Sequence, residues 1–488
     1  MSNIVFGNYN PVEEEQDESI DAVFGLFFDG TLNNKVNTKE RESNTKIYQK
    51  HGIKSWSKRQ LSEKKDTSYD NDWSNVARMS EACSSDYGIY IEGIGTENRG
   101  EDANGGFAFG SGDTGIRGKV RKGCEETVKR IKEKLGSKTT VKVLTLDVFG
   151  FSRGAAAARN FVYEVNKTKY AAKKKTYSKR RVNVTFYSDD DGNEVPIKEL
   201  PPRGHFGLKL KEAGITVERI VIRFLGIYDT VSSYHPNFSV SPNFSNDIEE
   251  LHLDDITAAK KIVHFIATDE HRENFDLTNV AYDKDARGKK QVPVYYGEEK
   301  TFPGVHSDIG GSYLSETEWV REIETTWTSL NNLKPLEDRL VAEGWYTRGQ
   351  LSYIGGNVYW ALKGVRELLQ TYSFIPLTFM TEKANNANCV QISMIKIKKG
   401  YDFSKDALLV RVEKKLREYV FKSGNPYDFK WVADLNKKYN NNKTNPDYIK
   451  ELSEQKDLRD LRNKYLHWSA DRYAIGMDPR SNRKRVVH

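Results

Sequence analysis

The sequence predicts an α/β fold with a mostly parallel sheet and helices on both faces, and two observations lead to this prediction. Short apolar runs that end in turn residues recur along the chain, and longer segments with helical periodicity lie between them. Such an alternation is typical of β-α-β units, in which a helix returns the chain to the start of a neighbouring parallel strand. The predicted strands are 22–30, 87–95, 141–150, 218–229 and 291–304.

Two segments between these runs are predicted as helices because their apolar residues recur near helical spacing. They span residues 116–135 and 256–272, and the second carries Ile256, Ala259 and Val263 at such a spacing. No repeat of fixed period is visible.

Three stretches do not continue the alternation, namely 33–75, 164–217 and about 313–465. We therefore expect an N-terminal tail, a catalytic domain with one long insertion, and a helical C-terminal region that acts as a lid or binds a partner. The expected bounds are 1–20 for the tail, 21–315 for the domain, about 164–217 for the insertion and 316–488 for the C-terminal region.

The composition restricts the class of protein. The chain has 488 residues, 37% of them hydrophobic, and its formal net charge of +7 is compatible with anionic lipid or an acidic partner but too modest to indicate nucleic acid. Three scattered cysteines suggest neither a disulfide framework nor a cysteine-type zinc site. We expect no nucleic acid, no metal and no cofactor.

The N-terminal residues show no basic segment followed by an apolar one, so we expect no signal peptide and synthesis in the cytoplasm. No window approaches 18 uninterrupted apolar residues, the minimum for a transmembrane helix. Any contact with a membrane should therefore be peripheral.

Residues 150–154, GFSRG, form a G-x-S-x-G pentapeptide between the predicted strand 141–150 and an alanine-rich stretch that predicts a helix. This context is typical of a nucleophile elbow, in which the serine occupies a strained turn and the two glycines avoid clashes. We interpret Ser152 as a nucleophile. The alternative is that Ser152 only caps the following helix.

A serine hydroxyl becomes a useful nucleophile when a histidine takes its proton and a carboxylate orients that histidine. In α/β-hydrolases the acid and then the histidine follow the serine along the chain, each after a strand. Asp229 ends the predicted strand 218–229, and His306 lies in a glycine-flanked loop after 291–304. The sequence thus predicts an α/β-hydrolase-like fold. Each residue could instead be an ordinary turn residue.

Second-rank candidates are His467 as the base and Asp308 as the acid. His467 lies beside Trp468 near the end of the sequence, where it could contact substrate or pack, and Asp308 could stabilise its own turn.

An oxyanion hole requires two backbone amides. One should come from Arg153, the residue after the nucleophile, and the other from the loop after the first strand, at Gly30 or Thr31. Asp29 is expected to form the turn. The segment 110–115, GSGDTG, fits a nucleotide-binding pattern, but no good strand leads into it, so we interpret it as a glycine-rich loop near the active-site rim.

Six motifs in this order resemble those of the α/β-hydrolase family that includes type VI secretion lipase effectors, the phospholipase class with a GFSRG elbow. They are FFDGTLNN, GSGDTGIRGKVRKG, DVFGFSRGAAAARNF, FLGIYDTVSS, ATDEHRENF and FPGVHSDIGGSY, within about residues 20–315, with a fainter similarity in YLHWSADRY. By motif matching, the family's Ser, Asp and His fall on Ser152, Asp229 and His306.

The resemblance implies an antibacterial phospholipase that cleaves carboxylic ester bonds. It also implies delivery by a contractile secretion machine through its spike protein, action at the target cell's membrane or periplasm, and neutralisation in the producer by an immunity protein. Two alternatives remain open, a soluble carboxylesterase for small esters and a non-catalytic adaptor with the hydrolase fold.

The chain departs from the family pattern by a long insertion between the serine and the aspartate. Residues 165–183 of this insertion contain eight Lys or Arg and no Asp or Glu. Basic residues near an anionic membrane each contribute about 1 kcal/mol to binding. We expect this segment to contact anionic lipid. A solvated loop or contact with an acidic spike are the alternatives.

Overall fold

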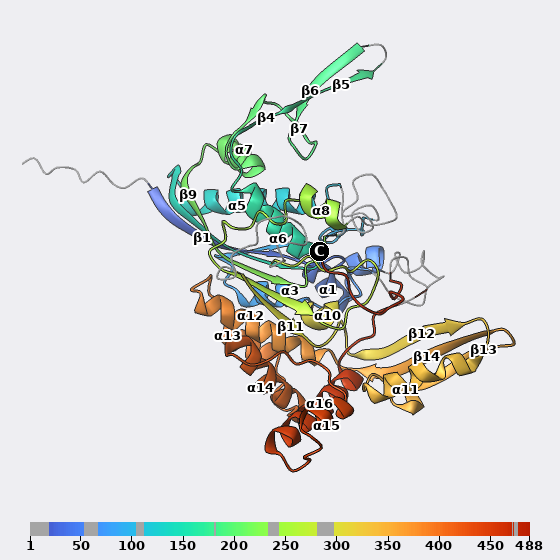
Figure 1. Cartoon of the computed structure of the whole chain (residues 1–488). Helices are drawn as coiled ribbons and strands as arrows, with labels where there is room; N and C mark the ends of the chain where they lie inside the picture. Colours follow the sequence, from blue (N-terminus) through green and yellow to red (C-terminus); the bar gives the residue numbers. More distant parts are fainter. Residues whose placement is uncertain are drawn as a thin grey trace, which may run out of the picture.

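A six-stranded parallel sheet forms the centre of the molecule (Figure 1). The structure is a computed structural model that describes residues 19–52, 67–103, 112–179, 182–232, 244–280, 297–470, 472 and 477–488. The strand order is β11-β10-β9-β3-β1-β2. The strands are β1 (Ser19–Phe28), β2 (Gly88–Ile91), β3 (Thr140–Phe151), β9 (Thr216–Tyr228), β10 (Ile262–Ala267) and β11 (Gly297–Phe302).

The strand order reverses between β1 and β3. The chain runs from β1 to β2 on one side and then crosses to β3 on the other, from which it continues outward through β9, β10 and β11. Loops that leave a parallel sheet at such a point diverge and open a crevice at the carboxyl ends of the strands. The register places Phe28 opposite Gly150 and Phe151 opposite Tyr228, so the loops after β1, β3 and β9 start side by side.

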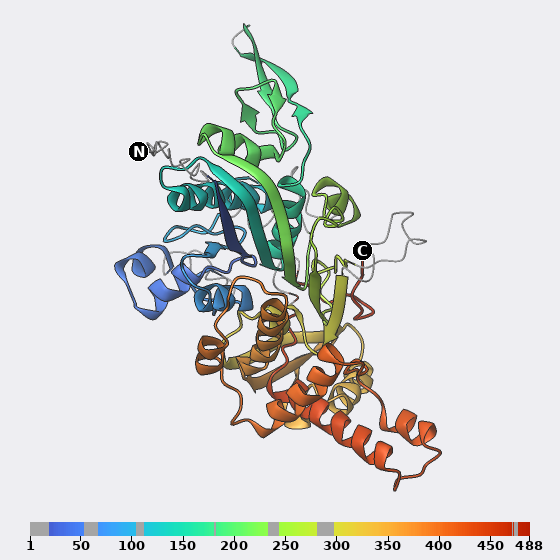
Figure 2. The ribbon, with the colours of Figure 1, turned by 90° about the vertical axis from the view of Figure 1, so that its left-hand side faces the viewer.

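Helices cover both faces of the sheet (Figure 1 and Figure 2). The α5 helix (Ile116–Leu135) and the α6 helix (Arg153–Glu164) pack on one face, while α3 (Asn75–Ala82) and α12 (Phe374–Asn386) pack on the other. Because successive side chains of a strand point to opposite faces, Phe27 and Phe28 belong to separate apolar clusters. The layers confirm the predicted fold class, and α5 confirms the predicted helix 116–135.

One predicted element is wrong. Residues 256–272, expected as a helix, contain the strand β10, whose six residues are all buried. A strand covered on both faces reads as a continuous apolar run, and periodicity alone does not separate such a run from a buried helix. The predicted strand 291–304 is found as β11, although its residues 291–296 lie outside the described residues.

The insertion forms an arm that projects from one end of the sheet (top of Figure 1). Its strands β5 and β6 pair in antiparallel fashion, and the exposed Lys173, Lys174 and Lys175 lie on β5. The elements are β4 (Tyr170–Ala171), β5 (Lys173–Lys179), β6 (Val182–Ser188), β7 (Glu194–Val195), β8 (Glu199–Leu200) and α7 (Gly204–Glu212).

The C-terminal region contains the predicted helices and, in addition, a sheet that the sequence does not predict. It begins with an antiparallel sheet in the order β12-β14-β13, formed by β12 (Glu316–Thr326), β13 (Leu351–Gly356) and β14 (Tyr359–Leu368). On β12 the side chain of Trp319 is exposed and that of its neighbour Val320 is buried. Such an alternation is typical of a strand in a sheet with one solvated face. Helices α11 (Lys334–Ala342), α13 (Met394–Gly400), α14 (Ala407–Phe421), α15 (Val432–Lys438) and α16 (Pro446–Lys464) accompany it.

Short elements complete the described chain: α1 (Lys35–Glu42), a π-helix (Tyr48–Gly52), α8 (Phe244–Glu250), α10 (His306–Gly310) and 3₁₀ turns at Leu330–Asn332, Arg348–Gln350 and Gln370–Ser373. None of the helices in the described ranges combines the length and the apolar character that a bilayer crossing requires.

Candidate active site

Ser152 occupies a strained turn between β3 and α6. Its φ of 59° and ψ of −129° lie in a region that residues with a Cβ rarely adopt. A Cβ on Gly154 would lie 2.2 Å from the carbonyl oxygen of Asp29, and one on Gly150 would lie 2.6 Å from Ala155 Cα, so both positions require glycine. The Ser152 side chain makes no capping hydrogen bond to α6, which disfavours a mere N-cap role.

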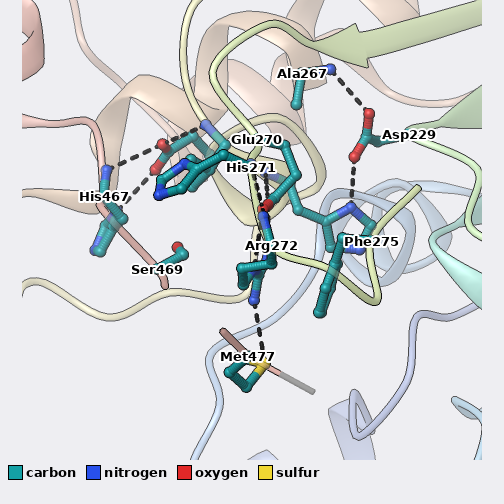
Figure 3. Close-up of polar contacts among 12 residues, drawn as sticks. Asp229, Ala267, Glu270, His271, Arg272, Phe275, His467, Ser469 and Met477 are labelled. Carbon is teal, nitrogen blue, oxygen red and sulfur yellow. Dashed lines mark hydrogen bonds and ion pairs between the residues drawn. The ribbon is translucent and has the colours of Figure 1, made fainter. Parts of the chain in front are cut away.

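Asp229 and His306 meet at the same edge of the sheet. His306 Nδ1 and Asp229 Oδ2 are 2.5 Å apart, and both side chains are buried. Asp229 Oδ1 also accepts a hydrogen bond from Ala267 N at 2.9 Å, drawn as a dashed line in Figure 3. The carboxylate is therefore held by the last residue of β10 and faces the imidazole.

The protonation states suit a general base. Burial alone would raise the pKa of Asp229, but the charge of Arg485 and hydrogen bonds from His306 and Arg485 hold it well below its usual range. Burial lowers the pKa of His306, and Asp229 opposes this only in part. A neutral imidazole that donates from Nδ1 to the carboxylate keeps the lone pair of Nε2 available for a proton.

The ring of Phe151, the residue before the serine, packs against the ring of His306. Its ring centroid is 4.6 Å from that of His306, and Ser152 N donates to the carbonyl of Tyr228, the residue before Asp229. No hydrogen bond joins Ser152 Oγ to His306 in the part of the chain that the structure describes. Hydrogen bonds of this kind commonly tighten only when substrate is bound.

The loop after β1 is organised by Asp29, which is buried. Its carboxylate accepts from Gly30 N at 2.8 Å, from Ser74 Oγ at 2.5 Å and from Tyr90 OH at 2.6 Å. The Gly30 amide is thus already engaged, which favours the Thr31 amide as the oxyanion donor. Arg153 Nε donates to Thr31 Oγ1 at 2.7 Å and ties this loop to the elbow.

We expect Gly30→Val to lower kcat by roughly 10²-fold, the scale of one lost oxyanion donor. A Cβ at Gly30 would lie 2.5 Å from Phe151 Cδ1 and 2.8 Å from Asn33 Nδ2, so the loop must move. Steady-state kinetics with a soluble ester measure the effect, and Gly349→Val, at a glycine with open space, is the matched control. A raised KM with unchanged kcat would place the donor elsewhere.

His467 and Asp308 form a second buried pair. His467 Nδ1 is 2.7 Å from Asp308 Oδ1, and Asp308 Oδ2 accepts from His467 N at 3.0 Å and from Val305 N at 2.9 Å (Figure 3). The His467 ring also stacks on Tyr313, with centroids 3.9 Å apart. This pair therefore anchors the turn that precedes His306.

Sequence reasoning missed three residues of this site. Glu270 Oε2 accepts from His306 N at 3.2 Å and pairs with Arg272 at 2.7 Å. Arg485 forms two hydrogen bonds with Asp229. Glu270 and Arg272 lie in the motif ATDEHRENF, which could have indicated them, whereas nothing in the sequence around Arg485 marks it.

Within the described ranges, no group of three or more His, Cys, Asp and Glu side chains is arranged to hold a metal ion.

A parallel sheet with the serine turn and the carboxylate–imidazole pair at its carboxyl edge defines a protein of the α/β-hydrolase class. The model of the family described as "T6SS, Phospholipase effector Tle1-like, catalytic domain" matches residues 24–333. The chain belongs to this family of type VI secretion phospholipase effectors.

A solved structure resembles the chain in fold. A structure of the Tle1 effector bound to the VgrG spike of the type VI secretion system aligns with a TM-score of 0.57 at 16% identity, and the match covers 96% of this chain and 94% of that chain. An uncharacterized protein from Pseudomonas aeruginosa aligns with a TM-score of 0.39 at 17% identity, over 92% of this chain and 64% of that one. A search of curated proteins gave no match.

Proposed function

We propose that the protein hydrolyses carboxylic ester bonds of phospholipids as a phospholipase of the A type, with Ser152, Asp229 and His306 as its triad. The observation that carries the proposal is the buried pair of His306 and Asp229 beside a serine on a strained strand-to-helix turn. The family assignment supports the substrate class.

In the proposed reaction His306 Nε2 takes the proton of Ser152 Oγ as the oxygen attacks the ester carbonyl. The amides of Arg153 and Thr31 stabilise the negative oxygen of the tetrahedral intermediate. When the intermediate collapses, His306 returns the proton to the leaving alcohol oxygen and an acyl-serine remains. Water, deprotonated by His306, then attacks the acyl-serine, and the fatty acid leaves as Ser152 regains its proton.

We expect the acid limb of kcat/KM to lie below pH 6.5, the ordinary pKa of histidine, because burial lowers the pKa of His306. Above its pKa the imidazole is neutral and can accept the serine proton, so activity at pH 6.5 should exceed half of the neutral plateau. A pH profile with a soluble ester checks this. A half-maximum above pH 6.5 would contradict the assigned base.

The function is tested by incubating the protein with phospholipid vesicles and identifying the products. We expect a free fatty acid and a lysophospholipid, from a single cleaved ester bond. Hydrolysis of a short-chain ester without attack on vesicles would indicate a soluble carboxylesterase. Activity on neither would indicate an adaptor with the hydrolase fold.

We also propose that the protein is an antibacterial effector that leaves the cytoplasm with a secretion spike, acts at the target cell's membrane or periplasm, and is neutralised by an immunity protein. The Tle1 effector bound to the VgrG spike supports a spike partner. The exposed lysines of β5 support a peripheral contact with anionic lipid. We retain the catalytic domain at 21–315 and a partner-binding or lid role for 316–488 as part of this proposal.

A further inference from the structure

We propose that Arg485 is a positioning residue of the triad, which holds the carboxylate of Asp229 against His306 from a segment far away in the sequence. The inference rests on the proposed function in that it takes His306 as the base. Arg485 lies in the segment 477–488, which is dark red in Figure 1. This segment runs back from the C-terminal helices toward the sheet.

The guanidinium of Arg485 forms hydrogen bonds with both carboxylate oxygens of Asp229. Nη1 donates to Oδ1 at 2.6 Å and Nη2 donates to Oδ2 at 2.9 Å, while only 5% of the Arg485 side chain is exposed. Such a fork fixes the plane of the carboxylate as well as its place. Since Oδ2 also binds His306 Nδ1, Arg485 determines how the carboxylate faces the imidazole.

Arg485 also reaches the other neighbour of the histidine ring. Its Nε donates to the carbonyl of Phe275 at 2.6 Å, and the Phe275 ring meets the His306 ring edge-on with centroids 5.1 Å apart. One side chain thus holds two groups that orient the imidazole, the carboxylate at Nδ1 and the aromatic ring at its edge.

The segment 477–488 is itself pinned to the loop that follows β10. Backbone hydrogen bonds join Leu277 N to the carbonyl of Val486 at 3.0 Å and His488 N to the carbonyl of Leu277 at 2.8 Å. Arg480 donates to the carboxylate of Asp276 and to the carbonyl of Glu273. These contacts place Arg485 without involving the triad, so seating of the segment and contact with Asp229 can be separated by substitution.

The charge of Arg485 has a predictable effect on the base. The charged groups that face His306 are Asp229 with its partner Arg485, and Glu270 and Arg272 from the loop after β10. A guanidinium that shares the charge of Asp229 weakens the attraction of this carboxylate for an imidazolium. Loss of the guanidinium should therefore raise the pKa of His306 and leave less neutral base at a given pH.

The test compares Arg485→Gln, Arg485→Lys and the matched control Arg480→Gln in the full chain. For Arg485→Gln we expect the acid limb of kcat/KM to move up by about one pH unit. We also expect kcat to fall by roughly 10²-fold, the scale of a misplaced catalytic group, with little change in KM. Arg485→Lys, which keeps the charge but not the fork, should restore the limb and recover kcat only in part. Arg480→Gln should change neither, because the backbone hydrogen bonds of Leu277 still hold the segment.

The His306 titration is also read without turnover, from the pH dependence of its low-field Nδ1–H proton resonance. This readout separates the inference from the proposed function, because a protein without esterase activity would still show the shift in Arg485→Gln. An unshifted titration in Arg485→Gln, or an equal shift in Arg480→Gln, would overturn the inference. If Arg485→Gln does not fold, Arg485→Lys decides, because wild-type kcat in that variant would show that the fork is not needed.

Discussion

Replacing Ser152 by alanine is expected to abolish ester hydrolysis, with a loss in kcat on the order of 10⁴-fold or more. The substitution removes the only atom that forms the acyl bond in the proposed reaction. The backbone of the turn is unchanged, since alanine tolerates a φ of 59° no worse than serine does. Release of fatty acid from vesicles and turnover of a soluble ester measure the loss.

Ser469→Ala is a matched control for this experiment, because Ser469 also has a φ of 59° and lies outside the proposed triad. Its hydroxyl contacts Tyr313 rather than a triad residue. We expect this variant to keep most of the activity. Near-wild-type turnover in Ser152→Ala would reject the hydrolase mechanism, whereas equal losses in both variants would point to damage of the fold.

His306→Ala is expected to be about as severe as the serine substitution, with a loss of roughly 10⁴-fold in kcat, because the serine hydroxyl then has no base. His467→Ala should cost much less, since the His467 pair with Asp308 supports the turn before His306 and contacts no atom of the triad. Steady-state kinetics of the two purified variants, compared at a pH on the neutral plateau, measure the difference.

The reverse ordering of the two variants would assign the base to His467. Thermal melts serve as the stability check, because both histidines are buried and truncation of either leaves a partner carboxylate behind. A lower melting temperature for His467→Ala with near-normal kcat would fit the anchoring role of this residue.

The placement of Ser152, Asp229 and His306 at the carboxyl edge of the sheet could be predicted because each lies at or shortly after the end of a predicted strand. Carboxyl ends of such strands meet at one edge, so three residues far apart in sequence become neighbours. The same local reasoning fails for β10, whose fully buried run carries no alternation, and it does not predict the strand β12.

Other features could not be predicted, for two physical reasons. Asp29 binds the amide of Gly30, and a hydrogen bond between adjacent residues depends on a turn geometry that the sequence does not specify. Arg485 meets Asp229 across 256 positions of sequence, and such a contact exists only after the whole chain has packed. The hydrogen bond of the Gly30 amide and the guanidinium of Arg485 beside Asp229 are therefore seen only in the structure.

The ring of Phe151 restricts how this site can be altered. A Cβ on Gly30 would lie 2.5 Å from it, a Cβ on Gly310 would lie 2.0 Å from it, and His306 packs on it with centroids 4.6 Å apart. The loop after β1, the short helix α10 and the imidazole thus all pack against the ring of Phe151. A substitution that displaces the Phe151 ring is therefore expected to shift the loop after β1, α10 and His306 together.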